Sequence, residues 1–193
     1  HVLILGSFPA SDWTDGQMRA VVRYVEAGGG LVWLGGADSF GVGGYAATSL
    51  APLFPWTLQP DEALLASGRY PVSVPPAAAT HPAMAGIAEL LASGQAAIES
   101  LNQSGTLKPG AVVLLEAGLQ DRPVPLAAVQ AFGRGRTLAL ASNTFWKWAR
   151  RSDALKDGYG RFWRQFVRYL ADRQEGGRVL NVLWDKPAYR PGE

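Results

Sequence analysis

Residues 28–36 read GGGLVWLGG, an apolar run of four residues enclosed by glycines. A short run bounded by turn-forming residues is typical of a strand buried on both faces of a parallel sheet. A second run of this kind, VLILG, occupies residues 2–6. Between the two, apolar residues recur at helical spacing from Met18 to Val25 and predict an amphipathic helix. Residues 2–36 are therefore predicted to form a right-handed β–α–β unit with parallel strands.

The rest of the chain continues the alternation of predicted helices and strands. Residues 80–94 begin with Thr-His-Pro and predict a helix with proline in its first turn. Apolar runs at 124–132 and 136–141 flank a Gly-Arg-Gly turn and predict a β-hairpin. Residues 159–170 place apolar side chains on one helical stripe. We therefore predict an α/β fold, a flavodoxin-like three-layer α/β/α sandwich whose sheet is mostly parallel with an antiparallel hairpin.

The composition excludes several kinds of site. The chain has 193 residues, a net charge of +2, two histidines and no cysteine. Disulfides, zinc–thiolate sites, iron–sulfur clusters and thiol nucleophiles are therefore excluded, and we expect no metal and no cofactor. No apolar run approaches the roughly 20 residues that span a bilayer, so we expect no membrane span in this segment.

The two ends of the chain suggest a domain cut from a longer polypeptide. The sequence begins inside a predicted strand, and residues 179–184 form an apolar run followed by a Pro/Gly/Tyr-rich segment. We predict an α/β domain over residues 1–176 and, over residues 177–193, a linker with the first strand of a following β-rich module. The alternative for this last segment is a frayed tail.

Charge is unevenly distributed along the chain. Before Arg134 there are 5 basic and 10 acidic residues, and from Arg134 onward 13 basic and 6 acidic. A basic half suggests an anionic partner, whereas the alternative is a solvated arginine-rich helix face. Nucleic acid is not the expected partner, because the sequence has no Lys/Arg block and no RNA-binding aromatic motif.

The loop after residue 34 is the first candidate for chemistry, because open α/β sheets bind ligands beyond the carboxyl ends of their strands. Residues 37–41 read ADSFG, similar to the G-x-S-x-G nucleophile elbow. Ser39 as nucleophile, or Asp38 as carboxylate nucleophile or base, could act with His81 in a hydrolase. The alternative is that Asp38 and Ser39 only satisfy backbone groups of the loop.

A second polar and aromatic segment follows a later strand. Residues 143–148 read NTFWKW, directly after the strand that is predicted to end at Ala141. Asn143 and Trp146 would then reach the same edge of the sheet as the glycine-rich loop. They form a pocket wall, or else the aromatic residues of this segment pack under the C-terminal helix.

As a set, these segments resemble the class I glutamine amidotransferase-like domains of large bacterial membrane-associated proteins. The marks are residues 28–36 with the following Asp-Ser-Phe and Gly-Gly-Tyr, Thr-His-Pro at 80–82, and residues 143–148. The resemblance implies a three-layer flavodoxin-like fold. It also implies that an active member has cysteine at the turn after a central strand, here at Ala37 or one residue either way, with histidine and glutamate from a later turn. Residues 142–144 read SNT instead, and cysteine is missing, so the resemblance implies no glutaminase reaction.

We therefore expect a catalytically inactive amidotransferase-like domain that serves as a binding or structural module. Its parent is expected to be a membrane-anchored bacterial envelope protein with this domain outside the cytoplasm. Expected partners are other domains of the parent chain, envelope proteins, or a small ligand in a vestigial pocket. The alternatives are a hydrolase and an anionic-partner surface in the arginine-rich half. The vestigial pocket is predicted to be lined by Gly36, Ala37, Asp38, Ser39, Asn143 and Trp146.

Overall fold

The predicted β–α–β unit is present in the computed structural model, which describes residues 1–91, 96–120 and 122–172. Strand β1 (Val2–Leu5), helix α1 (Asp15–Glu26) and strand β2 (Gly30–Leu34) follow one another, and the two strands pair in parallel. Helix α1 begins at a capping box, in which the Thr14 hydroxyl accepts from the Gln17 N–H and the Gln17 side chain accepts from the Thr14 N–H.

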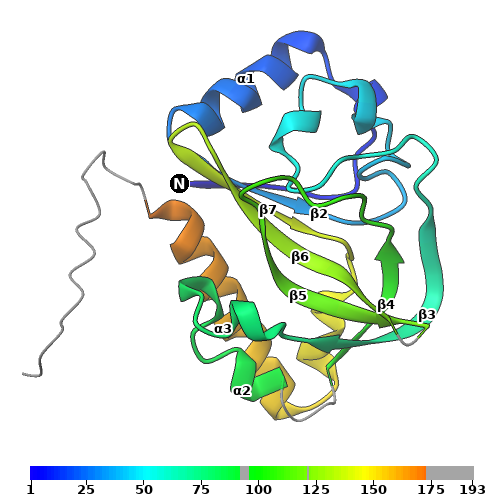
Figure 1. Ribbon diagram of the computed structural model, residues 1–193, viewed down its shortest axis with the longest axis vertical. Helices are drawn as coiled ribbons and strands as arrows, with labels where there is room; N and C mark the ends of the chain where they lie inside the picture. The colour runs from blue at the N-terminus through cyan, green and yellow to red at the C-terminus, as the bar shows by residue number, and fades with distance from the viewer. Residues whose placement is uncertain (92–95, 121, 173–193) are drawn as a thin grey trace, which may run out of the picture.

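Within the described residues, one seven-stranded sheet has the strand order β1-β2-β7-β6-β5-β3-β4 (Figure 1). The β1–β2 and β2–β7 pairs are parallel, and the other four pairs are antiparallel. The prediction of a mostly parallel sheet is therefore wrong, although the predicted hairpin is the β6–β7 pair. The remaining strands are β3 (Leu64–Ser73), β4 (Ala97–Asn102), β5 (Val112–Leu119), β6 (Arg122–Phe132) and β7 (Gly135–Leu140).

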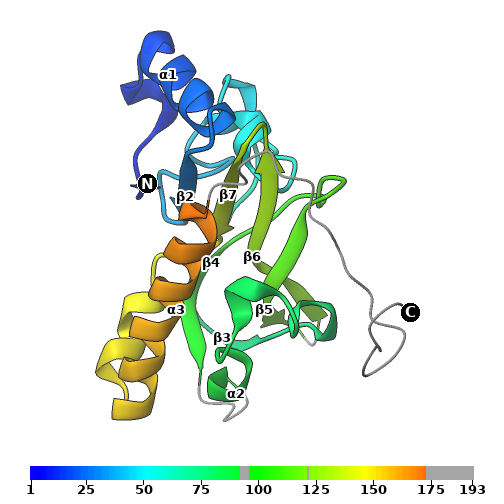
Figure 2. The ribbon, with the colours of Figure 1, turned by 90° about the vertical axis from the view of Figure 1, so that its left-hand side faces the viewer.

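Helices cover less of this sheet than a three-layer sandwich requires, and that prediction is not confirmed. The long helix α3 (Asp153–Ala171) is present as predicted and runs beside β2 and β7 (Figure 2). The helix predicted over residues 80–94 is broken into a 3-10 turn (Pro82–Met84) and the short helix α2 (Ala88–Leu91). Gly86 lies between them with a φ of 70°, a left-handed conformation that interrupts a right-handed helix. Residues 92–95 lie outside the described part of the chain.

The sheet curls so that its last strand returns to its parallel half. The Asn102 N–H at the end of β4 donates to the carbonyl of Ala141, the residue after β7. Nearby, the Glu99 N–H donates to the Thr144 hydroxyl, and the Trp148 indole N–H donates to the Ala97 carbonyl. Strand β4 therefore lies against the carboxyl ends of β2 and β7, although four strands separate it from β2 in the sheet order.

An aromatic cluster holds the loops that follow β2. It is formed by rings that stack or meet edge to face with centroids 4.5–5.9 Å apart. All of its rings are buried, so the long segment between β2 and β3 packs into the main hydrophobic core. The members are Trp33, Phe40, Tyr45, Phe54 and Trp56.

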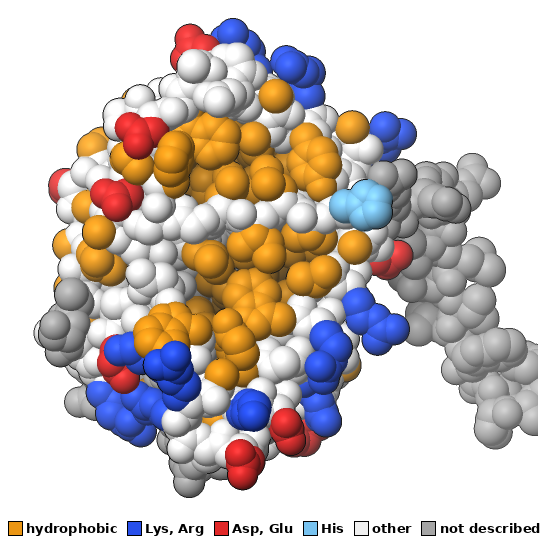
Figure 3. All heavy atoms as spheres, turned by 180° about the vertical axis from the view of Figure 1, so that it is seen from behind, with side chains coloured by type: hydrophobic (Ala, Val, Ile, Leu, Met, Phe, Trp, Pro, Cys, Tyr) orange, Lys and Arg blue, Asp and Glu red, His pale blue; other side chains and the backbone are white. Residues whose placement is uncertain are grey.

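The edge of the sheet at β1 is more open than its sequence predicts. Within the described residues β1 pairs with β2 alone, and Ile4 is 45% exposed although a strand buried on both faces was predicted. Phe8, just beyond β1, is 44% exposed. Apolar side chains also gather in two areas of the face seen from behind (Figure 3).

No helix in the described part of the chain is long and apolar enough to cross a membrane. The module predicted over residues 177–193 lies outside the described residues.

Candidate functional site

The Asn102 side chain forms two hydrogen bonds with the backbone of the turn that follows β2. The Asn102 Oδ1 accepts a hydrogen bond from the Gly36 N–H at 2.8 Å, and its Nδ2 donates to the Gly36 carbonyl at 2.9 Å. Gly35, one residue earlier, donates its N–H to the Leu140 carbonyl at the end of β7. Asn102 is 2% exposed, so this pairing is shielded from water. Neither β4 nor Asn102 was predicted from the sequence.

Glycine is required at both positions of this turn. A Cβ on Gly35 would lie 2.5 Å from Asn102 Oδ1 and 2.6 Å from the Ser142 nitrogen. Gly36 has a φ of 143°, and a Cβ there would lie 2.7 Å from the Ser7 hydroxyl oxygen. Any side chain at residue 35 would therefore displace Asn102 or the backbone after β7.

Ser39 satisfies a backbone group, as the alternative interpretation predicted, whereas the Asp38 carboxylate accepts from the Ser7 hydroxyl and not from the loop backbone. The Ser39 hydroxyl donates to the Leu34 carbonyl at 2.8 Å, and the residue is 2% exposed. Asp38 is exposed, and its N–H donates to the Ser7 hydroxyl at 2.9 Å. A nucleophile elbow joins a strand to a helix, whereas the element after this turn is a 3-10 turn (Tyr45–Ala47). Ser39 therefore satisfies the backbone of its own loop.

His81 lies at the other end of the sheet from Ser39. Its ring packs 4.8 Å from the ring of Tyr169, centroid to centroid, and its Nδ1 accepts from the Ala83 N–H. Burial, and secondarily the nearby Arg136 charge, lower the pKa of His81. Arg136 belongs to the start of β7, whereas the turn with Ser39 meets the end of β7 at Leu140. The structure does not bring His81 to Ser39 or Asp38, and the predicted hydrolase arrangement is not formed.

In the segment after β7, one tryptophan is buried and the other is exposed, so packing under the C-terminal helix holds for part of the segment only. Trp148 is fully buried, and its ring meets that of Phe162 in α3, as the packing alternative predicts. Trp146 is 46% exposed, and the Arg150 guanidinium lies 5.2 Å from its ring centroid. Asn143 accepts a hydrogen bond from the Ser100 hydroxyl at 3.0 Å.

Several basic side chains of the arginine-rich half are paired within the chain. Glu99 accepts hydrogen bonds from Lys147 and Arg151, and these two contacts are the main reason why the pKa of Glu99 is lowered. Arg136 donates to the carbonyls of Tyr169 and Asp172. An anionic partner for this half of the chain stays a prediction.

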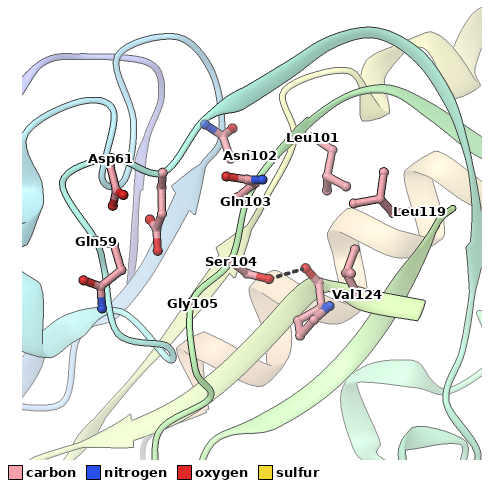
Figure 4. A pocket seen from close by; sticks show the side chains of 11 residues that line it. Gln59, Asp61, Leu101, Asn102, Gln103, Ser104, Gly105, Leu119 and Val124 are labelled. Carbon is pink, nitrogen blue, oxygen red and sulfur yellow. Dashed lines mark hydrogen bonds between the residues drawn. The ribbon is translucent and has the colours of Figure 1, made fainter. Parts of the chain in front are cut away.

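A hollow of about 380 Å³ lies beside the closed turn and has Asn102 in its wall (Figure 4). We call it the acidic hollow. Its polar wall comes from the segment before β3 and from residues 102–105, and its apolar wall comes from β4, β5 and β6. None of the six residues predicted to line a vestigial pocket lines the acidic hollow. Its lining is Gln59, Asp61, Glu62, residues 101–105, Leu119, Val124 and Pro125.

Glu62 is another residue of this wall that was not predicted from the sequence. It is 9% exposed, and within the described part of the chain neither carboxylate oxygen has a hydrogen-bond partner. The two oxygens lie against Gly41 and Gly105, 2.7 and 3.0 Å from where a Cβ would stand on each. Burial raises the pKa of Glu62. The nearby backbone N–H groups of Gln59 and Gly41, which do not complete a hydrogen bond to the carboxylate, oppose this rise only in part.

The comparison with known families supports the resemblance found in the sequence. The family model described as "Putative glutamine amidotransferase" matches residues 2–172. The chain belongs to this family. Its match ends one residue after α3, so it covers both the parallel and the antiparallel half of the sheet. A search among curated proteins finds no significant relative.

Solved structures similar to this glutamine amidotransferase-like chain are distant in sequence. Cytoplasmic protein STM1381 from Salmonella typhimurium LT2 has 18% identity and a TM-score of 0.68, covering 88% of this chain and 71% of that one. Cytoplasmic protein STM3548 from Salmonella typhimurium has 16% identity and a TM-score of 0.65, with the same coverage of 88% and 71%. The β-galactosidase from Rahnella sp. R3 has 13% identity and a TM-score of 0.55, over 87% of this chain and 22% of the enzyme. These likenesses show a shared fold alone.

Proposed function

We propose that this glutamine amidotransferase-like chain is catalytically inactive and serves as a binding or structural module of a larger bacterial envelope protein. The observation that carries the proposal is the buried pairing of Asn102 with both polar backbone groups of Gly36. The resemblance puts the nucleophile of active members at this turn, and the sequence has no cysteine to supply a thiolate.

The pairing also argues against a substitute nucleophile at this turn. Acyl transfer needs backbone N–H groups free to donate to the oxyanion of the tetrahedral intermediate, at about 2.7–3.1 Å. Here the Gly36 N–H already donates to Asn102, and the Gly35 N–H already donates to the Leu140 carbonyl. The Ser39 hydroxyl is likewise engaged, since it donates to the Leu34 carbonyl. Two backbone donors of this turn are therefore used inside the fold.

A binding role is supported by the acidic hollow. Its volume of about 380 Å³ is within the size of small-molecule sites, which are clefts of roughly 300–1,000 Å³. It lies beside the carboxyl ends of β2 and β7, where α/β sheets bind their ligands. The partners proposed are a small ligand in this hollow, other domains of the parent chain, or other envelope proteins.

An assay for ammonia released from glutamine tests the inactive state. The purified chain should release no ammonia above the protein-free blank, while an active class I amidotransferase assayed in parallel should. The variant Ala37→Cys supplies a thiol at the turn and should also stay inactive, because the amide donors remain occupied. Turnover by the unmodified chain that is lost in Ser39→Ala or Asp38→Asn would contradict the proposal.

The envelope location is tested separately with the full-length gene product. Its recovery in the membrane fraction, with this domain open to protease added outside the cytoplasm, is the expected result. Recovery in the soluble cytoplasmic fraction would contradict this part of the proposal and leave the assay of the turn unaffected.

A further inference from the structure

The two walls of the acidic hollow differ in chemistry. Figure 4 shows Gln59 and Asp61 on one side and Leu119 and Val124 on the other. Ser104 lies between them and donates its hydroxyl to the Pro125 carbonyl at 3.2 Å. A ligand that fits such a site has one polar end and one apolar end.

The charge of the polar wall determines whether the polar end of a ligand must be positive or negative. The titratable side chains that line the hollow are Asp61 and Glu62, and both are acidic. Glu62 is 9% exposed, and within the described residues its carboxylate oxygens complete no hydrogen bond and form no salt bridge. Lys108, a lysine of the neighbouring loop, donates instead to the carbonyls of Ala51 and Pro52. A buried carboxylate in this situation is stabilised by a cation or by a proton.

The position of the Glu62 carboxylate is defined by backbone rather than by flexible side chains. One oxygen lies against Gly41 and the other against Gly105. A Cβ on Gly105 would also lie 2.0 Å from the Thr57 carbonyl, so this approach of the two loops requires glycine. A charged group whose place is set in advance binds its partner with little loss of conformational entropy.

The Glu62 carboxylate lies covered in the wall of the hollow, beside two exposed polar residues. Both Glu62 oxygens are covered in the structure, whereas the side chains of Gln59 and Asp61 are exposed. The exposed Asp61 carboxylate attracts the cation first, and Glu62 then neutralises it away from bulk water.

We infer that the acidic hollow binds a small organic cation, a primary ammonium group on an apolar stem. The ammonium faces Asp61 and Glu62, and the stem lies on Leu119 and Val124. The inference rests on the proposed binding function and gives it a ligand class. The apolar wall favours an organic cation over a bare metal ion, which would leave that wall exposed to water.

Calorimetric titration with hexylammonium tests the inference, with hexanol and hexanoate as matched probes of the same chain length. At neutral pH and low salt the intact chain should bind hexylammonium more tightly than either probe. Glu62→Gln should weaken this binding about tenfold or more, because it removes a charge-assisted contact. Asp61→Asn should have a smaller effect that disappears in high salt. The control Glu89→Gln, an exposed carboxylate on α2, should leave binding unchanged.

The titration of the Glu62 carboxyl group gives an independent readout. Carbon-13 chemical shifts followed against pH should show a lower Glu62 pKa with hexylammonium bound, because a bound cation favours the ionised carboxylate. Equal binding of hexanol, unchanged affinity in Glu62→Gln, or tighter binding of calcium ion alone would overturn the inference. Ammonia release from glutamine, measured on the same samples, reports separately on the proposed lack of catalysis.

Discussion

Replacing Asn102 by alanine tests how strongly the turn after β2 is held. The variant removes two hydrogen bonds, of 2.8 and 2.9 Å, and leaves the N–H and the carbonyl of Gly36 without partners in a buried place. Each buried polar group left unsatisfied costs about 1–3 kcal/mol. We therefore expect the free energy of unfolding to fall by about 2–6 kcal/mol, a large part of the roughly 5–15 kcal/mol of a typical domain.

Urea unfolding of both proteins measures this loss, and the denaturant slope shows whether unfolding stays two-state. Asn102→Asp is the matched control. It keeps the size of the side chain and the acceptor for the Gly36 N–H, but it turns a carboxylate oxygen toward the Gly36 carbonyl. It should therefore also be destabilised, and its stability should recover partly at low pH as the carboxyl becomes a donor. A loss below about 1 kcal/mol in Asn102→Ala would refute the reasoning, because it would mean that the turn does not depend on this pairing.

Three further variants test other parts of the structure. Glu62→Gln should be more stable than the parent at neutral pH, and thermal unfolding should show the difference shrinking in acid. The sign follows from the raised pKa of Glu62: stability is fully present below the ordinary carboxyl pKa and is lost as pH rises through the raised one. Ser39→Ala should lose about 1 kcal/mol of stability through its bond to Leu34, with no change in hydrolysis of ester substrates; a loss of hydrolysis would restore the hydrolase interpretation. Ile4→Lys should change stability by less than about 0.5 kcal/mol and reduce self-association in light scattering, because it places a charge on an open strand edge.

Local patterns in the sequence were sufficient to predict the parallel half of the fold. Three local patterns each indicate an element that buries one or both of its faces. They are the apolar run at residues 28–36, the helical spacing from Met18 to Val25, and the apolar stripe of α3. The hairpin was also predictable, because its turn and both strands are adjacent in the chain. These elements are determined by residues within one or two turns of each other.

The antiparallel half was harder to predict, because strand direction depends on which neighbour a strand meets and not on its own residues. Strand β4 has no clear alternation, and its partners lie far away in sequence. Asn102 carries no local sign of its role, since the residue that it holds is 66 positions earlier. Glu62 follows an aspartate and looks like part of an exposed acidic loop; only the approach of Gly41 and Gly105 buries it.

The pairing of Asn102 with Gly36 also has a consequence for the order of folding. It joins residues 66 positions apart, and closing such a long loop is entropically unfavourable until other contacts support it. The β1–β2 unit with its helix can form from neighbouring residues, but its turn stays hydrated until β4 arrives. Substitutions at Asn102 should therefore mainly accelerate unfolding and hardly slow folding. The Asn102 amide would then form its hydrogen bonds late in folding, after most of the sheet has assembled.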